Sequence, residues 1–282
     1  MSVPLTDAVD ELARTLHDAR LAAREITRIT ESRPLTNDEA YSILEAGIAL
    51  REREGEQVVA YKMGLTSEAK RRQMGLHDSI FGILTDRMAL QAGIPYSLGG
   101  RIHPKAEPEI ALRVDRILDA RGGAITPDDA WAAVGAVAPA IEVLDSRYLG
   151  FKYFSLPDVI ADNASSSDYL VGTAVPKPSH WSELEKWKFE FCVHGRVAHE
   201  ALGSEISGSP IQSLVELAAL LAHRNQVLPA GSWVLLGAAT PAVALAPGIA
   251  VELRLEMPGG RALLRLDVET ASEKTHPAAS KS

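Results

Sequence analysis

Two glutamates, Glu107 and Glu109, stand two residues apart in the segment 103–110, which has the sequence HPKAEPEI. In an extended chain, residues at positions i and i+2 point to the same face and lie about 7 Å apart. The apolar residues Ile110 and Leu112 then fall on the opposite face. Carboxylate oxygens gathered on one face suit a hard divalent cation. The spacing therefore indicates part of a metal site.

A third carboxylate, Glu142, lies inside the apolar run 137–144, which has the sequence VAPAIEVL and predicts a buried strand. An ionised carboxylate buried alone costs several kcal/mol or takes up a proton, so Glu142 needs a cation. Ligation of a metal with Glu107 and Glu109 meets this need, and an ion pair with Arg147 or Arg113 is the alternative. Magnesium or manganese fits a site of oxygen ligands, whereas zinc prefers histidine or cysteine.

Lys62 ends a predicted apolar strand just before the segment 64–67, which has the sequence GLTS. Its ammonium could orient a substrate carboxylate or stabilise a developing enolate, or it could simply extend into water from the end of the strand. His77 and Asp78 follow in a predicted loop. Either could transfer a proton near neutral pH, and Asp78 joins Lys62 as a catalytic candidate.

Two further segments carry residues suited to ligand contacts. The cluster 162–167, DNASSS, could offer hydroxyl and amide groups to substrate oxygens, or it could be an ordinary polar turn. The segment 237–240, GAAT, predicts a backbone left bare for the close approach of a ligand. Phosphate-binding glycine loops and the GxSxG nucleophile motif do not occur, so nucleotide use and serine hydrolysis lack support.

Composition excludes several classes of protein. The chain has 282 residues, of which 46% are hydrophobic and 23% charged, as expected of a soluble protein with a large core. Its net charge of −8, without a basic stripe, argues against nucleic acid as a partner. It has no run of about 20 apolar residues and no signal-peptide pattern, so we expect no membrane partner and a cytoplasmic location. Cys192, the single cysteine, cannot form an internal disulfide.

The hydrophobic pattern predicts an α+β fold in which a small N-terminal helical or α+β region, 1–80, precedes a β-rich metal-binding domain, 81–270, and a disordered tail, 271–282. Thr36 and Glu39 form a capping-box pattern at the start of the second helix. The turn at 258–260 predicts a hairpin. The expected helices are 6–29, 36–53, a short one ending at 74, 126–134 and 211–224, and the clearest strands are 58–63, 189–194, 251–257 and 263–268.

Four blocks in this chain have a familiar order. They are YKMGLTS at 61–67, HPKAEPEI at 103–110, IEVLDSR at 141–147 and ADNASS at 161–166. Together they resemble the hydratase/decarboxylase branch of the fumarylacetoacetate hydrolase superfamily, and the likeness runs from about residue 5 to residue 270. The resemblance implies a mixed β-roll for the larger domain. It also implies that Glu107, Glu109 and Glu142 bind Mg²⁺ or Mn²⁺ and that Lys62 stands beside the substrate. The substrate-binding candidates are Leu65, Ser67, Asp162, Asn163, Ser165 and Ser166.

Within that branch, the YKMG and HPKAEPE motifs and the GAAT segment look more like those of the decarboxylases. The hydratases tend to carry Thr-Gly-Gly near the last position, where this chain has Leu236. The resemblance thus implies decarboxylation of a small 2-oxo dicarboxylate, 4-oxalocrotonate, to 2-hydroxypenta-2,4-dienoate in aromatic meta-cleavage catabolism. Hydration of that dienoate is the alternative activity, and an inactive partner that stabilises a pathway enzyme is the non-enzymatic one. A homo-oligomer is expected, with a complex with the pathway hydratase as a further option.

Overall fold

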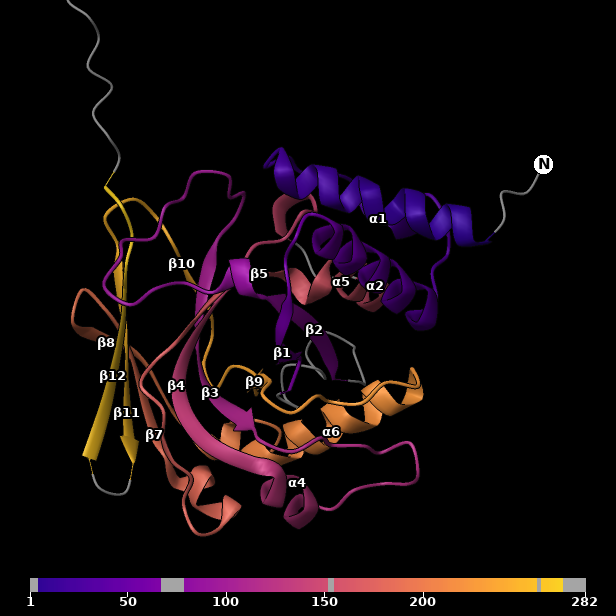
Figure 1. Cartoon of the computed structure of the whole chain (residues 1–282). Helices are drawn as coiled ribbons and strands as arrows, with labels where there is room; N and C mark the ends of the chain where they lie inside the picture. The colour runs from indigo at the N-terminus through magenta and orange to yellow at the C-terminus, as the bar shows by residue number, and fades with distance from the viewer. Residues whose placement is uncertain (1–4, 67–78, 152–154, 258–259, 271–282) are drawn as a thin grey trace, which may run out of the picture.

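The structure, a computed structural model, describes residues 5–66, 79–151, 155–257 and 260–270. Figure 1 shows a strongly curved central sheet with helices at its two ends and a smaller sheet along one side. The predicted helix ending at 74, the residues Ser67, His77 and Asp78, most of the hairpin turn and the tail lie outside the described ranges. No helix within those ranges is long and apolar enough to cross a membrane.

Three helices pack together at one end of the central sheet: α1 (Leu5–Leu21), α2 (Asn37–Arg53) and α5 (Leu156–Ala161). The predicted capping box of α2 is confirmed, because Thr36 Oγ1 accepts from Glu39 N at 3.2 Å and Glu39 Oε2 accepts from Thr36 N at 3.0 Å. The prediction that the first helix reaches residue 29 is wrong. Ala23 adopts a left-handed φ of 46°, and Arg24 N donates to Ala19 O at 2.9 Å, so the helix ends in a Schellman turn.

The main sheet has the strand order β2-β1-β9-β3-β4-β5, with β10 beside β3 and β6 beside β4. The pair β1–β9 is parallel and the other pairs are antiparallel, so the sheet is mixed. The strands are β1 (Val58–Gly64), β2 (Ile80–Thr85), β3 (Lys105–Val114), β4 (Val134–Leu144), β5 (Ser166–Val171), β6 (Val175–Pro176), β9 (Trp233–Leu235) and β10 (Val243–Ala244).

The two ends of this sheet meet again, which closes it into a roll. Leu90 N donates to Tyr169 O at 2.7 Å just beyond β2 and within β5. The side chain of Asn163 also accepts from Ile83 N and donates to Ile83 O, each at 2.8 Å, at the free edge of β2. The expected α+β class is confirmed by the mixed sheet and its helices.

A second sheet covers the outer face of the roll. Its order is β12-β11-β7-β8, and β11 and β12 pair as the predicted antiparallel hairpin. The outward-facing Ile110 and Leu112 of β3 join one apolar core with residues of this sheet and of α6. The elements are β7 (Lys188–Val193), β8 (Arg196–Leu202), β11 (Ala250–Met257), β12 (Gly260–Asp267), α4 (Pro127–Ala133) and α6 (Pro210–His223).

The inner face of the roll carries a separate, small apolar cluster. Its buried members are Ala60, Leu84, Met88, Ala111, Ala140, Tyr169 and Leu235. On β3, the residues Glu109, Glu107 and Lys105 follow Ala111 on the same face toward the start of the strand. The proposed boundary at residue 80 stays a prediction; β1, which precedes it, pairs with β9 within the main sheet.

Candidate metal centre

Strand pairing brings the three predicted carboxylates together. Glu107 and Glu142 are directly opposite each other in the antiparallel pair β3–β4, so their side chains share the inner face. Glu109 lies two residues further along the same face of β3. One oxygen from each carboxylate can be chosen such that all three lie within 4.8 Å of one another. This arrangement gives three oxygen ligands for a single cation.

Two of these carboxylates are inaccessible to water. Glu109 and Glu142 are both 0% exposed. Gly237 N donates to Glu109 Oε2 at 2.7 Å, but Glu109 Oε1 and Glu142 Oε2 form no hydrogen bond with the described residues. A buried carboxylate oxygen without a partner is costly, and a metal ion is the partner that suits an all-oxygen cluster. The residues therefore fit a divalent cation such as Mg²⁺ or Mn²⁺.

Burial and mutual repulsion disfavour the charged forms of this cluster. Burial, followed by the charges of Glu142 and Glu107, raises the pKa of Glu109 well above its ordinary value. Burial also raises the pKa of Glu142, and the ammonium of Lys62 is the main opposing influence. Three carboxylates face one ammonium here, so a divalent cation would balance the remaining charge.

The partner of Glu142 is Lys62, whose Nζ lies 3.2 Å from Glu142 Oε1. Lys62 is 3% exposed, so the alternative of a lysine extended into water is wrong. The predicted alternative partners of Glu142 are also wrong. Arg147 pairs with Asp162, and Arg113 pairs with Asp115 at 2.8 Å on the exposed surface. The structure thus joins the catalytic candidate Lys62 to the carboxylate cluster.

Two glycines leave room for this arrangement. A Cβ on Gly82 of β2 would lie 2.7 Å from Ser166 Oγ, 2.9 Å from Asn163 O and 3.2 Å from Lys62 Cε. Gly237 has a φ of +102°, and a Cβ there would lie 2.3 Å from Thr66 Oγ1. The bare backbone predicted at 237–240 therefore accommodates a side chain of the protein itself, while its N–H orients Glu109.

Two predicted substrate contacts, Asp162 and Asn163, are occupied within the protein. Asp162 accepts from the backbone N–H of Arg147 at 3.1 Å and from its guanidinium, and burial raises the pKa of Asp162 to about 6. The amide of Asn163 binds both backbone groups of Ile83. These contacts make Asp162 and Asn163 supports of the turn that closes the roll, and their contact with substrate stays a prediction.

Of the remaining predicted substrate contacts, Ser165, Ser166 and Leu65 are within the described residues. Residues 163–165 all have positive φ values, of 51°, 51° and 59°, and form a tight turn before β5. Ser166 follows this turn, and its hydroxyl lies against Gly82 of β2, which also packs against Lys62. Ser165 is buried, and Leu65 is half-buried just after β1 with a φ of 56°. Ser67 and Asp78 lie outside the described residues.

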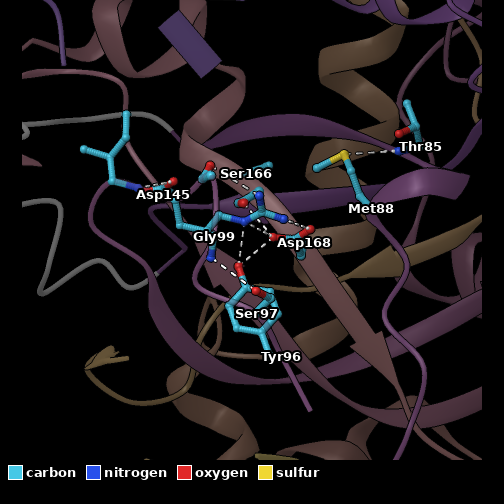
Figure 2. A network of polar contacts seen from close by, with 12 residues as sticks. Thr85, Met88, Tyr96, Ser97, Gly99, Asp145, Ser166 and Asp168 are labelled. Carbon is cyan, nitrogen blue, oxygen red and sulfur yellow. Dashed lines mark hydrogen bonds and ion pairs between the residues drawn. The ribbon is translucent and has the colours of Figure 1, made fainter. Parts of the chain in front are cut away.

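Sequence reasoning missed two residues that shape the site. Gly82 is a glycine inside a fully buried strand, a pattern that marks close approach of other groups. Asp145 accepts from Ile102 N at 2.9 Å and from His103 N at 2.5 Å, which fixes the chain just before β3; Figure 2 shows its contact beside Ser166. Nothing in the spacing of Asp145 indicates this role, because its partners are about 40 residues away.

Comparison with known proteins finds relatives along most of the chain. A 4-oxalocrotonate decarboxylase from a Pseudomonas species is 42% identical over 88% of this chain and 94% of its own length. A 2-keto-4-pentenoate hydratase from Burkholderia vietnamiensis is 33% identical over 85% of this chain and 90% of its own length. No protein-family model matches the chain.

Solved structures give a consistent result. The 4-oxalocrotonate decarboxylase from Pseudomonas putida G7, complexed with magnesium and adipate, superposes with a TM-score of 0.86 at 32% identity, covering 95% of this chain and 99% of that one. A putative fumarylacetoacetate hydrolase family protein from Yersinia pestis shares the fold alone, with a TM-score of 0.57 at 16% identity over 76% of this chain and 94% of that one. The chain therefore belongs to the family of 4-oxalocrotonate decarboxylases and 2-keto-4-pentenoate hydratases.

Proposed function

We propose that this protein is a divalent-metal-dependent decarboxylase that converts 4-oxalocrotonate to 2-hydroxypenta-2,4-dienoate in aromatic meta-cleavage catabolism. The observation that carries the proposal is the cluster of Glu107, Glu109 and Glu142 beside Lys62, in which the buried Glu109 Oε1 and Glu142 Oε2 form no hydrogen bond with the described residues. Relatives with the decarboxylase name support the choice of reaction, since they are 36–42% identical to this chain.

Glu107, Glu109 and Glu142 would hold the metal, with Gly237 N–H orienting Glu109. When bound, Mg²⁺ or Mn²⁺ supplies a Lewis acid that attracts electrons toward the C2 oxygen of a 2-oxo acid. The Nζ of Lys62 lies 3.2 Å from Glu142 Oε1, against this cluster and within a buried space. In such a space, a fixed cation stabilises developing negative charge far more than it would in water.

The proposed reaction breaks one bond and needs no oxidant or reductant. The bond between C5 and C6 of the substrate breaks, and C6 leaves as carbon dioxide. Its electron pair forms the C4–C5 double bond, the former C3–C4 double bond shifts to C2–C3, and the negative charge arrives on the C2 oxygen. Lys62 donates a hydrogen bond to that oxygen or to the C1 carboxylate, and the oxygen then takes up one proton.

The remaining candidates form the walls of the substrate site in this proposal. Leu65, which follows β1, would contact the substrate carbon chain, and Ser67 would contact the substrate oxygens. Ser165 and Ser166 would do so from the turn that Asp162 and Asn163 support. Asp78 would move a proton to or from the substrate. Ser166 and Lys62 both pack against Gly82, and this closeness supports the proposal that Ser166 contacts the substrate.

The second candidate is the hydratase activity, which adds water to 2-hydroxypenta-2,4-dienoate. Relatives named hydratase favour it, at 30–33% identity over most of the chain. An inactive partner of a pathway enzyme is less favoured, because the carboxylate cluster and Lys62 are intact. We further propose that the protein forms a homo-oligomer and a complex with the pathway hydratase. We also propose a cytoplasmic location, with which a single free cysteine agrees.

A paired substrate assay tests the proposal. The purified protein with Mg²⁺ is given 4-oxalocrotonate in one vessel and 2-hydroxypenta-2,4-dienoate in another, and absorbance and carbon dioxide are followed. We expect carbon dioxide and dienoate from the first substrate and little loss of the second. Rapid consumption of the dienoate without carbon dioxide release from 4-oxalocrotonate would make the protein a hydratase. Turnover of neither substrate would favour the inactive partner.

A further inference from the structure

Lys105 is a cation on the metal-facing side of the roll that no step above uses. It begins β3, two residues before Glu107 and four before Glu109, so alternation along the strand puts all three on one face. Lys105 pairs with Leu144 of β4 on one side and Ala244 of β10 on the other. It therefore lies about 7 Å from Glu107 along the strand, on the side away from the apolar cluster that contains Ala111.

The ammonium of Lys105 has an aromatic partner in place of an acidic one. Its Nζ lies 4.1 Å from the ring centroid of Phe151 in the short helix Leu149–Phe151. Among the described residues, no carboxylate forms an ion pair with it. Lys105 is only half-buried. An aromatic face holds a cation in place without neutralising its charge, so the ammonium stays available to an anion.

Both sides of this contact are fixed by other elements. Glu25 Oε1 accepts from Gly150 N at 2.7 Å and lies 2.5 Å from His103 Nε2, which ties the residue before Phe151 to the chain that enters β3. Asp145 holds the backbone of His103 from the end of β4. Lys105 thus has a built environment on each side, unlike a lysine dispersed in solvent.

We propose that Lys105 binds the distal carboxylate of a dicarboxylate substrate whose 2-oxo acid end lies at the glutamate cluster. The inference rests on the proposed function and names the group that recognises the second charge. In an extended six-carbon diacid, the distance between the two carboxylate carbons is comparable to the spacing of about 7 Å between the Cα atoms of Glu107 and Lys105 along β3. Lys62 is less suited to this task, because it is buried against Glu142 at the other end of the substrate. Lys105 therefore selects dicarboxylates over monocarboxylates.

Calorimetric binding with a matched pair of ligands tests this assignment. With Mg²⁺ present, 2-oxoadipate and 2-oxohexanoate have the same chain length and the same 2-oxo acid end, but only 2-oxoadipate has a distal carboxylate. We expect Lys105→Met to weaken 2-oxoadipate about tenfold to a hundredfold, as for loss of a charged hydrogen bond, and 2-oxohexanoate less than about twofold. Lys105→Arg should restore most of the difference. Equal weakening of both ligands, or no weakening of 2-oxoadipate, would overturn the proposal.

Two controls separate this proposal from others. Lys188→Met removes a lysine of the second sheet that pairs with Glu190 and Glu200, and it should change neither affinity. Thermal unfolding of each variant shows whether it folds. If the wild-type protein releases no carbon dioxide from 4-oxalocrotonate, the proposed function fails; the ratio of the two affinities still decides whether Lys105 binds the distal carboxylate.

Discussion

Three carboxylates and one ammonium lie together on the inner face of the roll. The excess of negative charge in this cluster explains why the residues favour a bound cation. Glu109 and Glu142 lose their hydration on burial, and Lys62 compensates only one charge. Buried charges persist in folded proteins when they are paired or bind a metal. The raised pKa values of the two glutamates report the same imbalance. A divalent cation is the simplest group that would remove it.

The substitution Gly82→Ala tests how tightly the residues around Lys62 are packed. The added Cβ would lie 2.7 Å from Ser166 Oγ and 3.2 Å from Lys62 Cε, so one of these groups must move. We expect a decrease in kcat/KM of at least about tenfold with a loss of about 1–3 kcal/mol in the free energy of unfolding. Steady-state kinetics and urea unfolding measure the two effects.

Gly47→Ala is the matched control, since nothing lies within 4 Å of its added Cβ in the helix α2. This variant should keep full activity and gain up to about 1 kcal/mol, because alanine favours a helix over glycine. Unchanged activity in Gly82→Ala would show that the contacts around Lys62 do not limit turnover.

A site residue could be predicted from the sequence when the pattern that marks it lies among its near neighbours in the chain. Glu107 and Glu109 are found from alternation within one strand, and Glu142 from its apolar surroundings. The pairing of Lys62 with Glu142 is not predictable in this way, because the two residues are 80 positions apart and lie on strands separated by β9 and β3. Arg147, which is close to Glu142 in sequence, pairs with Asp162 instead.

Local sequence patterns predicted the central residues of the helices and strands well, but they predicted less well where these elements end. The capping box of α2 and the β11–β12 hairpin follow from a few adjacent residues. The end of α1 was missed because alanine, which usually favours helix, takes the left-handed position at Ala23. A turn within 162–167 was one of the two interpretations of that polar cluster, but its three positive φ values at 163–165 could not be predicted, since the turn is held by contacts with Ile83 and Arg147.

The pH dependence of stability tests the link that Glu25 makes between the N-terminal segment, Gly150 and His103. The Gly150 N–H, followed by His103, lowers the pKa of Glu25 below its usual value of 4.5. A carboxylate whose folded pKa is lowered stabilises the fold above its unfolded pKa and loses that effect as the pH falls through its folded pKa. We expect wild type to be more stable than Glu25→Gln at pH 6–7, with the difference shrinking below about pH 4.5.

Urea unfolding of both proteins at several pH values measures this difference. Because Glu25 also holds the residue next to Phe151, the variant should weaken 2-oxoadipate more than 2-oxohexanoate. A stability difference that stays constant, or that grows on acidification, would contradict the role assigned to the Glu25 carboxylate.

At the scale of the whole molecule, closure of the mixed sheet creates an interior with two parts. One part is the apolar cluster around Ala111, and the other is the charged cluster around Glu109. The α+β class could be predicted from the order of periodic segments, whereas strand order could not, because β1 and β9 pair across more than 160 residues. The β-roll was predicted from the resemblance of four sequence motifs, at 61–67, 103–110, 141–147 and 161–166, to a known family. Hydrophobic periodicity alone does not predict which strands pair.

Release of labelled carbon dioxide from 4-oxalocrotonate carrying ¹³C at C6 directly tests whether this protein is a metal-dependent decarboxylase. We predict ¹³CO₂ from the wild-type protein with Mg²⁺, none after chelation, and recovery when Mg²⁺ is restored. Glu109→Gln, which keeps the size of the side chain but loses its charge, should fold normally and release at most about one hundredth as much. Equal release by Glu109→Gln, or by the chelated wild type, would contradict a metal-dependent decarboxylase at this glutamate cluster.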